Sequence, residues 1–228
     1  MAKGLVAAFP FHNGAQGTVA QIYATTLSNV AGNERINGTL TATTTPSQYW
    51  ASSDRGGCVH FDGVDDTVSL GTAAFINGAK MSISLWAKLD ALSTYCTVIG
   101  RSATTAWASG WGINRYVLNS TANFGFFVGN NATQAAKVAA TTVTANVWHN
   151  MVGTYDGTNI NFYLDLVAGD PDTTDVGNVP ETGTLSIGGK LGGYANADGH
   201  MAGFVRDIRI WNRVISERER QLIYAKAV

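Results

Sequence analysis

The sequence predicts an all-β protein that closes with one short helix, on three observations. Short runs with apolar side chains at alternate positions recur along the whole chain, which is the pattern of half-buried strands. Turn-forming residues separate these runs, and the chain holds 26 glycines. A single helical pattern follows the last run and begins with the capping-box pair Ser216 and Glu219. No repeat or linker divides the 228 residues, so we expect one domain over residues 1–228.

The first part of the chain opens with an apolar strand and continues into a polar stretch over residues 14–30. This stretch has neither strand nor helix periodicity, so we expect an irregular insert there. Strands resume after it, interrupted by a loop around Pro46 and Trp50 and by a turn over Asp62–Asp66. The strands expected in this part are Gly4–Phe11, Gly38–Thr41, Cys58–Asp62 and Thr67–Leu70.

The run Met81–Leu89 has the clearest alternation in the chain. One set of positions is apolar and the other holds polar residues and one tryptophan, so one face packs on a partner sheet and the other lines a more open surface. The first set is Met81, Ile83, Leu85, Ala87 and Leu89, and the second is Ser82, Ser84, Trp86 and Lys88.

The second part of the chain contains a strong hairpin signal, because Asp156-Gly157 separates two alternating runs. We expect these runs to pair as adjacent antiparallel strands, and the helix to span Glu217 to about Lys226. The strands expected in this part are Thr97–Arg101, Gly112–Leu118, Phe124–Gly129, Trp148–Tyr155, Asn159–Leu166, Thr184–Gly188 and Phe204–Asn212.

The composition restricts the partners and the compartment. The chain has 15 basic and 16 acidic residues and no basic run, so we expect no nucleic-acid partner. No stretch is long enough to span a membrane, so we expect no membrane insertion. The apolar run within Met1–Pro10 is too short for a secretory leader, which predicts synthesis in a cytoplasm. There, Cys58 and Cys96 are expected to be free, mostly buried thiols, and a disulfide between them is the alternative.

Four motifs in a fixed order carry a family resemblance, together with Gly38-Thr39-Leu40 at the end of an Asn-rich loop. This order resembles the laminin-G-like branch of the concanavalin-A-like lectin/glucanase superfamily, over nearly the entire chain. The resemblance implies a jelly-roll sandwich of two antiparallel sheets, one of them curved. The motifs are Phe61-Asp62-Gly63-Val64-Asp65-Asp66, then Ser84, Trp86 and Lys88, then Trp148 to Gly157, and finally Asp207, Arg209, Ile210, Asn212 and Arg213.

The resemblance also implies a calcium site, because many members of the family hold calcium with acidic residues of the opening loop and of the Asp-Asp turns. In this chain the residues that match are Asp62, Asp65, Asp66 and Asp207, whereas His12 and Asn29 replace two of the acidic positions. Calcium takes six to eight oxygens, and Arg206 beside Asp207 opposes a cation. The alternative is a hairpin turn at Asp62–Asp66 and an Asp207–Arg209 pair. We favour this alternative and expect no required cofactor.

The sequence predicts no enzymatic activity. Hydrolases of this superfamily place paired carboxylates on one strand in the pattern Glu-x-Asp-x-x-Glu, and retaining chemistry needs two carboxyls about 5 Å apart. The four glutamates make no such pattern, and Asp165 has no acidic residue two or four positions away. We expect His149 to be a structural residue of a sheet. The glutamates are Glu34, Glu181, Glu217 and Glu219.

One functional hypothesis is a carbohydrate-binding lectin or adhesion module. Sugars are bound by aromatic faces and by polar groups in loops. Two loops carry such residues, and their aromatic residues have burial in the core as the alternative role. We assign Trp86, Trp148 and Trp211 to packing. The candidate glycan contacts are Trp107, Trp111 and Asn114 in the first loop and Tyr194, Asn196 and Asp198 in the second.

The other hypothesis is a structural protein of a virion surface, such as a decoration or cement protein of a phage capsid. The domain fills the sequence, no leader is recognised, and the chain is nearly neutral and rich in Ala, Thr and Gly. Its partner would be a capsid or another surface lattice, with the insert at 14–30 as an anchoring segment. We favour this role and a virion-surface location over an extracellular lectin. Formation of a homo-oligomer stays open.

Overall fold

The structure is a computed structural model. The residues that it describes are 5–9, 26–27, 38–41, 50–53, 56–72, 80–92, 95–102, 109–118, 121–130, 132–139, 141–169, 174, 176–179, 183–189 and 199–226. The insert predicted at 14–30 lies outside this set, except for a two-residue strand at Thr26–Leu27.

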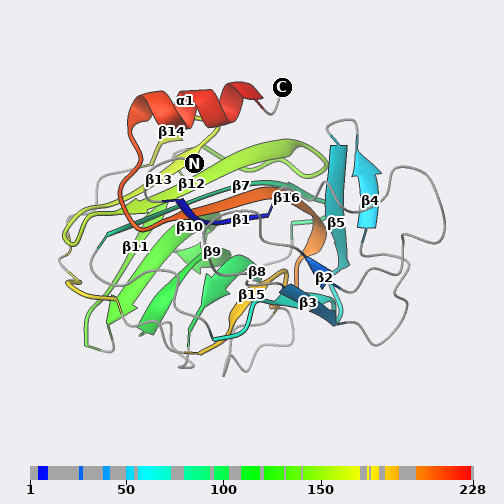
Figure 1. The fold of residues 1–228 in the computed structure, drawn as a ribbon, viewed down its shortest axis with the longest axis horizontal. Coiled ribbons are helices and arrows are strands. Elements are labelled where there is room, and N and C mark those ends of the chain that lie inside the picture. Colours follow the sequence, from blue (N-terminus) through cyan, green and yellow to red (C-terminus); the bar gives the residue numbers. More distant parts are fainter. Residues whose placement is uncertain are drawn as a thin grey trace.

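Two antiparallel sheets lie face to face, as the resemblance implied (Figure 1). Sheet A has the order β14 (Val167–Ala168), β13 (Ile160–Leu164), β12 (Trp148–Tyr155), β7 (Met81–Leu89), β16 (Ala202–Trp211), β5 (Gly56–Asp62) and β4 (Trp50–Ser53), and β1 (Leu5–Phe9) pairs with β16. Sheet B has the order β11 (Gln134–Val138), β10 (Thr121–Asn130), β9 (Ser109–Leu118), β8 (Cys96–Arg101), β15 (Leu185–Ile187), β6 (Thr67–Ser69), β3 (Gly38–Thr41) and β2 (Thr26–Leu27).

The main core lies between the sheets and is built from the apolar sets of alternating strands. The apolar positions of β7 are buried there, as their alternation predicted, in the same cluster as Phe124, Phe126 and Val128 of β10. The two layers approach so closely at Gly153 in β12 that a Cβ added there would lie 2.5 Å from the ring of Phe126. A side chain at this position would therefore collide with the opposite sheet.

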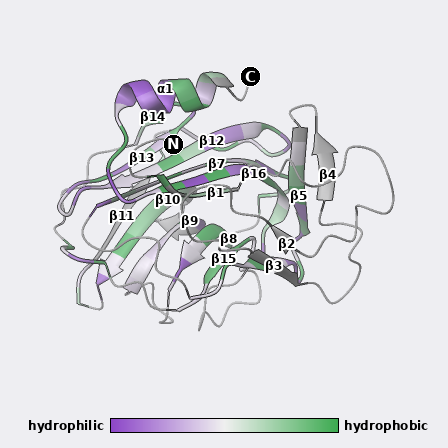
Figure 2. Cartoon of the chain, viewed as in Figure 1, coloured by the Kyte–Doolittle hydropathy of each residue, from purple (hydrophilic) through white to green (hydrophobic). Residues whose placement is uncertain are grey.

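The helix α1 (Glu217–Lys226) packs on the outer face of sheet A, the face turned away from the core (Figure 1). The predicted capping box is confirmed: the N–H of Ser216 donates to Oε2 of Glu219 at 2.8 Å, and the N–H of Glu219 donates to Oγ of Ser216 at 3.3 Å. Ile223 is buried against the sheet with Val152 and Trp211. In Figure 2 the first part of α1 is hydrophilic and its middle is hydrophobic, where Ile223 lies.

Four of the described strands were missed by the sequence analysis, each at a sheet edge: β2, which lies in the predicted insert, β4, β11 and β14. β4 includes Trp50, which we had placed in a loop. β11 contains Ala and Lys, which are weak strand formers, and it exists because it pairs with β10. β14 follows a tight turn in which Asp165 and Leu166 have φ of 50° and 69°, so the predicted strand Asn159–Leu166 ends too late.

Both cysteines are buried thiols that form no disulfide, as predicted. Within the described segments, no helix combines the length and the apolar character that crossing a membrane requires.

Candidate functional site

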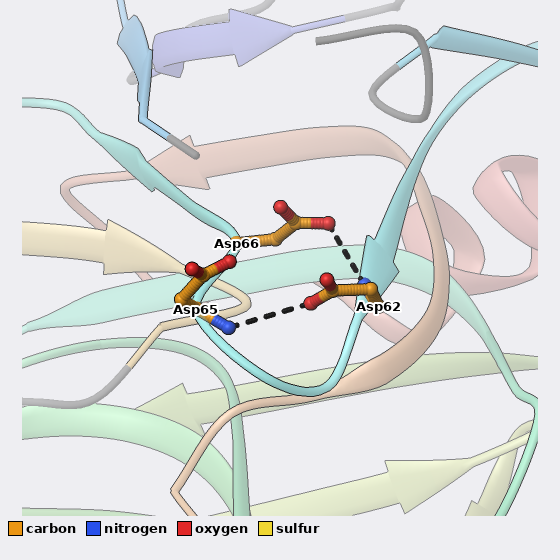
Figure 3. A group of neighbouring side chains, drawn as sticks. All are labelled: Asp62, Asp65 and Asp66. Carbon is orange, nitrogen blue, oxygen red and sulfur yellow. Dashed lines mark hydrogen bonds between the residues drawn. The ribbon is translucent and has the colours of Figure 1, made fainter. Parts of the chain in front are cut away.

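The turn after β5 brings three of the predicted metal ligands together (Figure 3). One carboxylate oxygen from each of Asp62, Asp65 and Asp66 lies within 4.8 Å of the others. Backbone hydrogen bonds fix the turn: Oδ1 of Asp62 accepts the N–H of Val64 at 2.8 Å, and Oδ2 of Asp66 accepts the N–H of Asp62 at 2.8 Å. A turn lies here as predicted, but it is not a hairpin, because it joins β5 of sheet A to β6 of sheet B.

The carboxylate oxygens of this turn are ligands of the kind that bind calcium. Burial, and then the charges of Asp62 and Asp65, raise the pKa of Asp66, whereas the hydrogen bond from the backbone of Asp62 lowers it. Oδ1 of Asp65 is buried and has no hydrogen-bond partner among the described residues. Oxygen ligands suit calcium, but three carboxylates supply only part of the six to eight oxygens that it takes. Backbone oxygens or water would complete the set.

Asp207 does not belong to this group. It lies at a bulge of β16, with φ of 51°, and Arg209 donates to its carboxylate at 2.8 Å and 2.9 Å. Ala202 pairs with Asp62, so Asp207 lies five residues further along β16, about 16 Å away. The predicted Asp207–Arg209 pair is confirmed, and the grouping of Asp207 with Asp62 is wrong.

Two of the six predicted glycan contacts lie in the described part of the chain, and neither is in a loop. Trp111 and Asn114 both belong to β9. Trp111 is 0% exposed and packs in the main core, so it offers no ring face to a sugar, and its assignment is corrected. The other four contacts, Trp107, Tyr194, Asn196 and Asp198, lie outside the described residues.

Asn114 lies on the outer face of sheet B, because its neighbours Trp111 and Ile113 point into the core from the alternate positions. It is 4% exposed, and its Oδ1 has no hydrogen-bond partner among the described residues. On this face Asn114 pairs with Gly125 of β10 and with Thr97 of β8, and Gly112, two residues earlier in β9, pairs with Gly100 and Phe127. The ring of Phe127 fills the space at Gly112, because a Cβ added there would lie 2.7 Å from it. Gly125 leaves one side of Asn114 without a side chain, and glycine inside a strand often marks the close approach of a ligand or of another group. This face presents one amide oxygen that has no hydrogen-bond partner among the described residues.

The outer face of sheet A carries a cluster of aromatic and cationic side chains that the sequence analysis did not identify as a site. The register aligns four residues across β12, β7, β16 and β5, which we call the outer row: Trp148, Lys88, Phe204 and His60. Nζ of Lys88 lies 4.5 Å from the ring centroid of Phe204 and 5.8 Å from that of Trp148. His60 lies 4.4 Å from Phe204, and its Nε2 donates to Oδ2 of Asp90 at 2.9 Å.

Further aromatic and cationic side chains of this cluster lie next to the outer row, beneath α1. The guanidinium of Arg206 lies 5.5 Å from the ring of Trp86 and 5.2 Å from the ring of Trp148. Tyr224 of α1 packs on Trp86 at 5.3 Å. The packing role predicted for Trp86 and Trp148 is confirmed, but their partners are α1 and this cluster, not the opposite sheet. The alternation of β7 was the available signal, since it had placed Trp86 and Lys88 on the same open face.

The buried His149 pairs with the partly exposed Asp165, and both ring nitrogens of the histidine are used. Nδ1 donates to Oδ2 of Asp165 at 2.6 Å, and Nε2 accepts the N–H of Thr144 at 3.1 Å. The other oxygen of Asp165 accepts the N–H of Asn150 at 2.8 Å. This pair fixes the β13–β14 turn to β12, in agreement with the structural role predicted for His149.

Solved structures with this fold include carbohydrate- and receptor-binding domains. Domain 4 of AbnA, a GH43 extracellular arabinanase from Geobacillus stearothermophilus solved in complex with arabinotriose, is 16% identical, with a TM-score of 0.67 over 94% of this chain and 95% of that one. The binding domain of botulinum neurotoxin serotype G is 12% identical, with a TM-score of 0.68 over 97% of this chain and 51% of that one. The binding domain of Paraclostridial Mosquitocidal Protein 1 is 12% identical, with a TM-score of 0.65 over 98% of this chain and 52% of that one. This chain thus spans about half the length of the toxin domains. At these identities the likeness establishes the fold.

Comparison of the sequences themselves gives the family. A search of curated proteins found no relative of this sequence. A laminin-G family model, described as the concanavalin A-like lectin/glucanases superfamily, matches residues 62–219. The match runs from the acidic turn to the first turn of α1 and includes the last three of the four motifs in full. The chain belongs to the concanavalin A-like lectin/glucanases superfamily, in its laminin-G-like branch.

Proposed function

We propose that this chain is a non-catalytic carbohydrate-binding module whose sugar contacts Asn114 on the outer face of sheet B. The observation that carries the proposal is the amide oxygen of Asn114, which is buried beside Gly125 and has no hydrogen-bond partner among the described residues. A buried acceptor without a hydrogen bond costs about 1–3 kcal/mol, and a sugar hydroxyl would supply the missing donor. Gly125, which pairs with Asn114, places no side chain between this amide and an approaching sugar ring.

The solved structures support a binding role. The arabinanase domain was solved with a trisaccharide, and the two toxin domains are named for binding. Because Asn114 is only 4% exposed, its surroundings would have to rearrange as the sugar enters.

The absence of catalysis is part of the proposal. Glu217 and Glu219 lie on α1, on the outer face of sheet A, and Glu219 is held by Arg213 at the helix start. Both nitrogens of His149 are engaged, so this residue has no nitrogen free to accept a proton without losing its bond to Thr144. The hydrogen bonds of Glu219 and His149 therefore give both residues a structural role.

Calcium binding at the acidic turn stays a separate proposal. Asp62, Asp65 and Asp66 would hold the ion, and calcium bound there would offer a coordination position to sugar hydroxyls. The virion decoration role favoured from the sequence, with its location and lattice partner, stays a prediction. None of the described residues bears on it, and the structures compared above are not virion proteins.

A glycan array probed with the purified chain, followed by calorimetric titration with arabinotriose, tests the proposal. The variant is Asn114→Leu, because leucine has the same branching as asparagine but no hydrogen-bonding group. The matched control is Asn150→Leu: Asn150 is also buried with an unpartnered Oδ1, but it lies on the outer face of sheet A. We expect Asn114→Leu to weaken sugar binding about tenfold or more and Asn150→Leu to leave it unchanged. If the wild-type chain binds no glycan on the array, the proposal is wrong.

A further inference from the structure

We propose that a second carbohydrate site lies on the outer face of sheet A, where Lys88 and Phe204 of the outer row meet Asp90. The inference rests on the proposed function in one respect, that the chain binds carbohydrate. It concerns a different place, since the outer faces of the two sheets lie on opposite sides of the core. The occupant is one uncharged sugar ring.

Lys88 provides a fixed hydrogen-bond donor. Its ammonium lies over the ring of Phe204 and beside that of Trp148, and these contacts hold its position. Lys88 makes no ion pair and no hydrogen bond within the part of the chain that the structure describes. Its three N–H donors are therefore available to a ligand, although the side chain itself is half-buried.

Asp90 provides the complementary acceptor. It follows Lys88 by two residues, so their backbones lie about 7 Å apart along the extended chain. His60 engages Oδ2 of Asp90, and Oδ1 has no such partner among the described residues, while the side chain is 39% exposed. One hydroxyl of a sugar ring would accept from Lys88 and another would donate to Asp90. Hydrogen bonds to charged groups are the stronger ones.

The rings beside these charges supply the apolar part of the site. Phe204 and His60 are both partly exposed and lie 4.4 Å apart. Tyr224 of α1 covers Trp86, and Trp86 is buried, whereas Phe204 retains exposed surface. Aromatic surface with a few placed polar groups is the usual composition of a sugar site. Of the two described side chains proposed to bond the sugar hydroxyls, Lys88 is positive and Asp90 is negative, so their charges balance and the site fits an uncharged sugar.

The test is calorimetric titration of the full chain with three neutral trisaccharides, namely arabinotriose, xylotriose and cellotriose. Wild type is compared with Lys88→Met, which keeps the apolar stem and removes the ammonium, and with Asp90→Asn. The matched control is Lys80→Met, because Lys80 is an exposed lysine just before the opposite end of β7. Circular dichroism verifies that each variant is folded.

We expect each wild-type chain to bind two sugars. Lys88→Met should abolish binding at one of these two sites or weaken its affinity about tenfold, and Asp90→Asn should have the same effect. In the background Asn114→Leu, the remaining binding should depend on Lys88 alone. If wild type binds sugar and Lys88→Met changes neither the stoichiometry nor the affinity, the second site is wrong and the site at Asn114 stands. If wild type binds none of the three sugars, both proposals are contradicted.

Discussion

Replacing Asn114 by leucine should make the protein more stable while weakening its binding of sugar. In the folded protein the amide oxygen of Asn114 is buried, and none of the residues that the structure describes donates a hydrogen bond to it. Leaving such a group unsatisfied costs about 1–3 kcal/mol, and an apolar side chain of the same branching avoids this cost. For a chain of this size each kcal/mol corresponds to a rise in Tm of about 2–4 °C. If Asn114 were retained for its packing, the same substitution would lower the Tm.

Urea unfolding and differential scanning calorimetry measure this change. The urea midpoint of Asn114→Leu should rise with an unchanged m-value, because the surface exposed on unfolding is nearly the same. Leucine is larger than asparagine, and overpacking alone can cost about 1–3 kcal/mol. Asn114→Ala therefore serves as a second variant that removes the amide without adding volume, and it should weaken sugar binding to the same degree.

The reasoning is refuted if Asn114→Leu and Asn114→Ala both lower the midpoint while sugar binding stays at the wild-type level. That result would mean that Asn114 has a hydrogen-bonding role within the protein and no ligand. A gain in stability without any loss of binding would mean that the orphaned oxygen is not part of the site.

Three further predictions concern stability. Gly153→Ala should destabilise the protein by about 1–3 kcal/mol, since its Cβ would lie 2.5 Å from the buried ring of Phe126. In urea unfolding, the double variant Gly153→Ala/Phe126→Leu should lose less free energy of unfolding than the sum of the losses of the two single variants. Arg213 lowers the pKa of Glu219 from 4.5 to about 2, so this pair stabilises the fold above about pH 4.5 and the contribution is lost as the pH falls toward 2. Glu219→Gln should flatten the dependence of Tm on pH in that window, and an acid decline equal to that of the wild type contradicts it. Calcium should raise the Tm of wild type but not that of Asp65→Asn in thermal scans run against EDTA, and equal shifts would exclude the acidic turn.

The sheets and the helix were predictable where local pattern and tertiary environment agree. The alternation of β7 gave its strand and its core face, because a strand buried on one side needs a period of two. The capping box gave the start of α1, because Ser216 and Glu219 satisfy the first amides by themselves. β11 was not predictable in the same way, since its Ala and Lys residues become a strand only through pairing with β10.

The candidate site was predicted less well, and glycines explain the main error. We placed Trp111 in a loop and began the next strand at Gly112, but β9 already begins at Ser109 and contains both Gly110 and Gly112. A Cβ at Gly110 would lie 1.9 Å from the carbonyl oxygen of Arg101, and one at Gly112 would lie 2.7 Å from the ring of Phe127. These glycines mark close contacts within a sheet, which a single sequence does not distinguish from turns. Trp111 was consequently placed in solvent when it belongs to the core.

The outer row on sheet A could not be predicted from the sequence, for a different reason. Its members come from β5, β7, β12 and β16, which are far apart in the sequence, and only the register of those strands aligns them. The motifs that gave the fold already contained Lys88 and Trp148, but they carried no information on His60 or Phe204 as their neighbours. The turn Asp62–Asp66, by contrast, is local, and its grouping could be predicted from the sequence alone.

The most direct test of the central claim is an NMR titration of the isotope-labelled chain with arabinotriose. The account predicts chemical-shift changes at the side-chain amide of Asn114 and at the backbone amides of Gly100, Gly112 and Gly125, which line the outer face of sheet B. A spectrum in which these four signals stay fixed at saturating sugar, whether or not other signals move, would contradict it.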